Sequence, residues 1–189
     1  MEFSYKLNSI GWADVHLKIG KSEIYMSPSY LSEPLIDLVR SIEILLPECT
    51  PEDEVKKSIE FEWDSEPAIH NWKIERKSEE QIQIVITYYE DGIKKNSGQV
   101  EFQEVCDLNM FIFKIVNILE DLLKNHGLVG YRKQWYAQDF PISSYLQLKY
   151  VLTHQAEFPL TTINPNEWNQ RIDSKLTEEL RLINQVFEL

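Results

Sequence analysis

Glu60 and Glu62 are the pair of side chains in this sequence best spaced for shared chemistry. They alternate with Phe61 in the segment SIEFEWDSEP (residues 58–67), so both carboxylates lie on one face of an extended strand. Two neighbouring carboxylates can serve as acid and base in a hydrolase. A glycosidase pair normally sits among aromatic side chains that stack on sugar, whereas here the aromatics point the opposite way. The pattern favours a strand with one apolar face and one acidic face.

The histidines supply no recognisable metal or catalytic motif. The four are scattered, and none belongs to an HExxH motif or to a pair at helical spacing. His16 shares a strand face with Asp14 and could bind a metal or act as a base, but the sequence names no third partner. The chain also lacks a glycine-rich phosphate loop and a G-x-S-x-G elbow. We therefore expect no catalytic residues, no metal ligands and no cofactor.

The charge of the chain indicates the class of its partner. Its 189 residues carry a formal net charge of −12, which disfavours binding to nucleic acid or to an anionic membrane surface. We therefore expect a basic protein as the partner, with no nucleic acid and no membrane. Solubility alone is a sufficient reason for an acidic composition, and that alternative stays open.

Three further features concern the compartment. Cys49 and Cys106 lie far apart and belong to no CxxC spacing, so we expect two reduced thiols. The N-terminal segment MEFSYKLNSIGW has no basic stretch followed by an apolar run, unlike a secretory signal. The most apolar segment, LNMFIFKIVNILEDLL, is interrupted by charges and is too short to cross a bilayer. Together these features predict a cytoplasmic protein.

Alternating apolar residues dominate the first half of the chain and predict strands. Connections are short and contain no helical crossover after residue 57, which indicates an antiparallel meander of six to seven strands. One amphipathic helix is expected at 33–46, with Ser32 as its cap and Pro34 in its first turn. The expected strands are 2–7, a hairpin over 12–27, and then 57–64, 69–76, 81–89 and 98–105.

The second half of the chain has helical periodicity. Asp107 is expected to cap a central helix that ends near His126, with Gly127 at the stop position. Another helix is expected to begin at Pro141, and the last helix is expected to begin at the cap Asn164. The aromatic segment 130–140 is interpreted as a loop that plugs the junction of helix and sheet. The chain is thus predicted to be one α+β domain over 1–189, mostly sheet over 1–105 and mostly helical over 106–189, with the helices on one face.

An acidic surface is the main candidate for a functional site. Between Glu43 and Glu66, nine acids against two lysines leave a net charge of −7. No lysine is interleaved among the acids Glu60, Glu62, Asp64 and Glu66, as a merely soluble face would usually have. We expect a partner-binding surface made by Glu60, Glu62, Asp64 and Glu66 on the strand, with Glu52, Asp53 and Glu54 on the preceding loop.

Three segments carry a resemblance to a known group of proteins. GWADVHLKIG, SYLSEPLIDLVRSI and YRKQWYAQDFPISSYLQL resemble segments of small uncharacterised bacterial cytoplasmic proteins, some of which are immunity proteins encoded beside polymorphic or contact-dependent toxins. The resemblance implies a non-catalytic protein that neutralises a basic toxin by direct binding, and it carries over no site residue. Two alternatives stay open: a hydrolase-like enzyme of unrecognised type, and a structural or regulatory module that dimerises through its apolar C-terminal helix.

Overall fold

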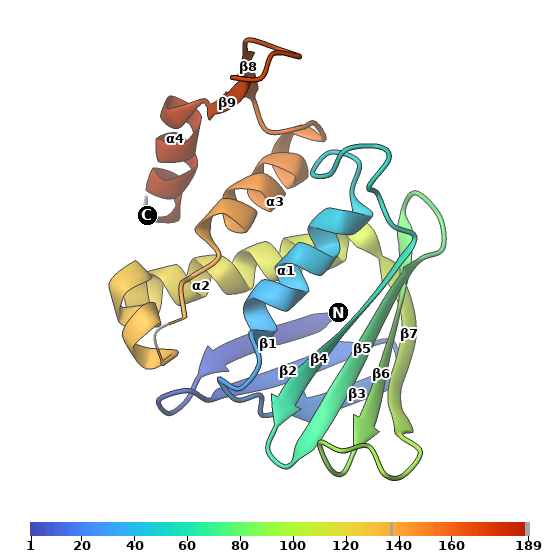
Figure 1. Ribbon diagram of the computed structural model, residues 1–189. Helices are drawn as coiled ribbons and strands as arrows, with labels where there is room; N and C mark the ends of the chain where they lie inside the picture. The colour runs from blue at the N-terminus through green and yellow to red at the C-terminus, as the bar shows by residue number, and fades with distance from the viewer. Residues whose placement is uncertain (137, 188–189) are drawn as a thin grey trace.

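The strands of the first half form two separate antiparallel sheets (Figure 1). The computed structural model describes residues 1–136 and 138–187. One sheet has three strands in the order β1-β2-β3 and the other has four in the order β4-β5-β6-β7, so the predicted single sheet of six to seven strands is wrong. The strands are β1 (Glu2–Leu7), β2 (Ala13–Ile19), β3 (Ser22–Met26), β4 (Ser58–Ser65), β5 (Ala68–Arg76), β6 (Gln81–Tyr89) and β7 (Gln99–Asp107).

The sheets are separate because helix α1 (Pro34–Leu45) lies between β3 and β4 in the chain and packs against β4. The two sheets share one core and are also joined by hydrogen bonds at two places. The backbone N–H of Ser29, in the loop after β3, donates to the carbonyl of Asp64 at 2.7 Å. At the other end, the hydroxyl of Ser22 donates to the carboxylate of Glu104 on β7 at 2.9 Å. These contacts position the sheets against each other without forming a continuous ladder.

Helix α2 (Leu108–Gln134) lies against both sheets and contacts β1 and β7. Asp107 caps it as predicted, since its carboxylate accepts a hydrogen bond from the backbone N–H of Met110 at 2.7 Å. Gly127, with φ 61° and ψ −178°, interrupts the helical geometry at the predicted stop. A short helical continuation follows to Gln134 where we expected a loop, although Tyr131 and Trp135 are buried in the core as the plug interpretation requires.

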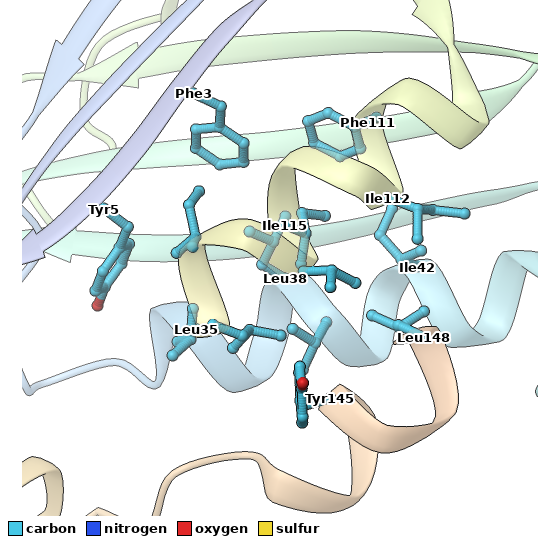
Figure 2. Close-up of a cluster of buried hydrophobic side chains, with 14 of the residues drawn as sticks. Phe3, Tyr5, Leu35, Leu38, Ile42, Phe111, Ile112, Ile115, Tyr145 and Leu148 are labelled. Atoms are coloured by element: carbon cyan, nitrogen blue, oxygen red, sulfur yellow. The ribbon is translucent and has the colours of Figure 1, made fainter. Parts of the chain in front are cut away.

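The main core lies where β1, α1, α2 and α3 (Ile142–His154) meet (Figure 2). The ring of Phe3 stacks on that of Phe111, with centroids 5.6 Å apart. Trp63 and Trp72, on neighbouring strands, are fully buried with their rings 4.6 Å apart. Aliphatic side chains of α1, α2 and α3 pack together in this core, as Figure 2 shows for Leu35, Leu38, Ile42, Ile112, Ile115 and Leu148.

The C-terminal segment differs from the predicted helix. Residues 164–175 are not helical, because Asn164 and Asn166 adopt left-handed φ values of 51° and 66° and reverse the chain. The reversal pairs β8 (Leu160–Ile163) with β9 (Arg171–Ser174), and helix α4 (Leu176–Phe187) follows. Across the described parts of the chain, no helix combines the length and the apolar character needed to cross a membrane.

Candidate protein-binding surface

The carboxylates on β4 point away from the core, as the alternation predicts. Trp63 is fully buried, while Glu60 and Glu62 are exposed on the outer face of the four-stranded sheet. Glu60 stands opposite Lys73 on β5, and the Oε1–Nζ distance is 3.2 Å. Glu62 forms an ion pair with Lys94, from the loop after β6. The expectation that no lysine is interleaved is therefore wrong, because neighbouring strands supply the bases.

Asp64 and Glu66 complete the predicted strand set near the β4–β5 turn. The carboxylate of Asp64 accepts a hydrogen bond from the backbone N–H of Glu66 at 3.1 Å. The backbone N–H of Asp64 donates to the hydroxyl of Ser32 at 2.9 Å. Asp64 therefore helps to fix the turn and the adjoining loop, and Glu66 is the exposed member of this pair.

Glu52, Asp53 and Glu54 lie in the connection between α1 and β4 and are all exposed. A tight turn holds them there, since the backbone N–H of Glu54 donates to the carbonyl of Pro51 at 2.8 Å. Within residues 1–136 and 138–187, none of the three carboxylates forms an ion pair. This loop and Glu66 lie at opposite ends of β4 (Figure 1), roughly 25 Å apart for a strand of this length. The structure therefore spreads the seven predicted residues along the whole strand.

Two adjacent hollows lie beside this acidic loop, and we name them together the Phe158 groove. The first, of about 460 Å³, is lined by residues 47–52 of the loop and by the segment from Glu157 to Leu160. The second, of about 380 Å³, is lined by residues of α3 and α4 together with Phe158, Leu160 and Ser174. Both hollows share Gln147, Phe158 and Leu160, and among the residues that the structure describes no lysine, arginine or histidine lines either one.

Sequence reasoning missed the Phe158 groove because its residues come from four distant segments. Phe158 is buried, with only 8% of its surface exposed, and its ring lies 5.2 Å from that of Tyr150. Leu160 is 55% exposed at the rim. The apolar part is made by Ile142, Leu146, Phe158, Leu160 and Ile183. The acidic part of the first hollow is made by Glu48, Glu52 and Glu157, and Glu179 adds a carboxylate to the second.

The environment of the groove disfavours negative charge. Burial raises the pKa of the Cys49 thiol to about 12, and the carboxylates of Glu43, Glu48 and Glu157 act in the same direction. On α1, burial and the nearby Glu33 raise the pKa of the Asp37 carboxyl to about 6. Carboxylates along α1 and its following loop therefore share a negative field, which a cationic group would relieve.

His16 does not pair with Asp14 as the sequence suggested. Its Nε2 lies 2.8 Å from Oε1 of Glu23 on β3, and its ring stacks on Tyr25 with centroids 4.4 Å apart. These side chains form an exposed cluster on the outer face of the three-stranded sheet. In the part of the chain that the structure covers, no group of three or more histidine, cysteine, aspartate or glutamate side chains is placed to bind a metal ion.

No protein-family model matches this chain, and searches of curated proteins and of solved structures found no match. The contacts and charges of its own residues are therefore what bear on its function.

Proposed function

We propose that this chain is a non-catalytic protein that binds a basic protein partner through its acidic surface. The observation that supports this function is the loop of Glu52, Asp53 and Glu54, which is exposed and forms no ion pair among the described residues. A cluster of uncompensated charge attracts an oppositely charged partner and orients it on approach. The positive charge that complements this loop comes from the partner's own lysine and arginine side chains.

The seven predicted residues contribute unequally to this surface. Glu60 and Glu62 already contact lysines, so a partner must displace those lysines or bind beside them. The three loop carboxylates and Glu66 have no such competitor in the described chain. Electrostatic attraction is therefore stronger at the loop, although all seven residues remain within the proposed surface.

The sharper form of the proposal is an immunity protein that acts in the bacterial cytoplasm. Such a protein binds a basic toxin domain directly and neutralises it without chemistry. The resemblance of three segments of this chain to proteins of that group supports this form, and so does the formal net charge of −12.

The experiment begins with the gene beside the one that encodes this chain. Its product is purified, and its affinity for this protein is measured by isothermal titration calorimetry. The proposal expects a basic product that binds saturably and whose activity is lost on binding. A neighbouring product that is a metabolic enzyme and does not bind would contradict the immunity function.

A second function, a module that dimerises through α4, is favoured by one observation. Leu176, Leu180 and Phe187 lie on one stripe of this helix and are 61%, 50% and 57% exposed. An apolar stripe of this kind usually marks an interface. Sedimentation velocity tests it: a dimer that Leu176→Lys/Leu180→Lys converts to a monomer would support this function, and a monomeric native chain would reject it.

A further inference from the structure

We propose that the Phe158 groove receives an amphipathic segment of the basic partner. Apolar side chains of that segment enter the hollow beside Leu160 and Ile183, and its lysine or arginine side chains lie over Glu48, Glu52 and Glu157. The inference rests on the proposed function, because it assigns the docking site of the same partner.

The apolar part of the groove provides the anchor point. Phe158 forms a buried floor, held by its contact with Tyr150, and Leu160 rises beside it from β8 with more than half of its surface exposed. Ile183 of α4 lines the opposite side. Interfaces take most of their binding energy from a few apolar anchors that fill preformed hollows of this kind.

The acidic part of the groove selects the charge of the occupant. Glu48, Glu52 and Glu157 line the first hollow, and none of them forms an ion pair within the described residues. No basic side chain in the described part of the chain lines either hollow, so these residues give the groove no positive charge. An occupant that carries cations beside its apolar residues matches both parts at once.

The same charges disfavour a second copy of this chain as the occupant. A two-fold contact through the groove would bring Glu48, Glu52 and Glu157 close to their own counterparts. Like charges placed across an interface oppose association, and the net charge of −12 adds to that repulsion. A basic segment instead neutralises the acidic lining as it binds.

The apolar surface continues from the groove along α4. Ile183 belongs both to the second hollow and to the stripe formed by Leu176, Leu180 and Phe187. An amphipathic helix of the partner could therefore extend beyond the two hollows and cover this stripe. Burial of these side chains would add to the affinity in proportion to the apolar area removed from water.

The test uses a synthetic helical peptide with leucines on one face and lysines on the other, carrying a photo-crosslinker. The control peptide has glutamate in place of every lysine. We expect the lysine peptide to bind saturably and to crosslink to residues 47–52, 157–160 or Ile183. The glutamate peptide should not bind.

Two variants test the apolar part without changing charge. Leu160→Gln removes the exposed anchor, and Ser143→Trp fills the second hollow from an exposed position of α3. Each should weaken peptide binding by about tenfold or more. The matched control Val105→Gln changes an apolar residue of β7 that is 46% exposed and lies outside the groove, and it should leave binding unchanged.

Several outcomes would overturn the groove assignment: no saturable peptide binding, crosslinks confined to other surfaces, or equal binding by Leu160→Gln and the native protein. The proposed function has a separate readout. If the whole basic partner binds Leu160→Gln and Ser143→Trp normally but binds Asp53→Asn/Glu54→Gln weakly, the groove assignment fails while the acidic docking function stands. If the whole partner does not bind the native chain, the proposed function itself fails.

Discussion

The ammonium of Lys73 lies 3.2 Å from the carboxylate of Glu60, directly across the β4–β5 ladder. This pair changes the interpretation of the acidic strand, because Glu60 and Glu62 each meet a lysine from another strand or loop. Exposed pairs of this kind contribute roughly 0–1 kcal/mol to stability. Their larger effect is on the field that an approaching partner meets.

Removing the base should therefore strengthen the negative field. Lys73→Gln leaves Glu60 uncompensated, so association with a basic partner should become faster at low salt, and thermal stability should change little. Stopped-flow fluorescence measures the rate. An association rate of Lys73→Gln equal to that of the native protein at low salt would show that the strand face takes no part in docking.

Two buried titratable groups should have opposite effects on stability in acid. Burial lowers the pKa of His70 to about 4, and its Nδ1 lies 3.0 Å from the hydroxyl of Ser65. The unfolded state binds the proton first, so stability is lost as the pH falls from about 6.5 to 4. The loss is on the order of 3 kcal/mol. Asp37 has the opposite effect, because its pKa is raised to about 6 and the folded state binds the proton first. Its contribution to the stability of the protein therefore rises as the pH falls from about 6 to 4.

Single variants separate these two contributions. In Asp37→Asn, stability should fall with decreasing pH more steeply than in the native protein, because only the His70 contribution remains. In His70→Gln it should fall less steeply, or rise. Urea unfolding at a series of pH values gives the free energy of unfolding of each protein as a function of pH. Parallel curves for the native protein and the two variants would contradict the shifted pKa values of His70 and Asp37.

Gly127 offers a test of the helix boundary. Its φ of 61° and ψ of −178° form a conformation open almost only to glycine, although a Cβ there would meet no atom within 4 Å. Gly127→Ala should destabilise the protein by about 1–3 kcal/mol. The matched control Gly130→Ala lies in helical backbone and should be neutral or stabilising by up to about 1 kcal/mol. The free energy of unfolding of both variants is measured in denaturant. Equal changes in the two would show that an alanine at position 127 is not strained.

Local periodicity was sufficient to predict most elements of the fold. The strands β4 to β7, the helix α1 and the cap at Asp107 follow from patterns of a few residues each. The number of sheets did not follow, because it depends on how strands that are distant in the sequence pack against each other. The C-terminal helix was extended too far, since Trp168 and Ile172 fit the helical stripe although they are 98% and 60% exposed in the hairpin.

The candidate site was predicted only in part, for a similar reason. The outward direction of Glu60 and Glu62 follows from alternation, and a hairpin turn at Glu66–Pro67 would have placed Lys73 opposite Glu60. The register of this hairpin is therefore enough to predict the ion pair between Glu60 and Lys73 from the sequence. The Phe158 groove could not be predicted from the sequence, because no pattern within a single segment indicates that the α1–β4 loop, α3, β8 and α4 come together.

The most direct test of the docking surface is a comparison of association rates with the purified basic partner. The loop variant Glu52→Gln/Asp53→Asn/Glu54→Gln and the strand variant Glu60→Gln/Glu62→Gln are measured at low and at physiological salt. We predict that the loop variant associates about tenfold more slowly at low salt and loses most of its salt dependence, while the strand variant changes less. Native association kinetics in the loop variant, with unchanged salt dependence, would contradict the proposal that these carboxylates guide a basic partner.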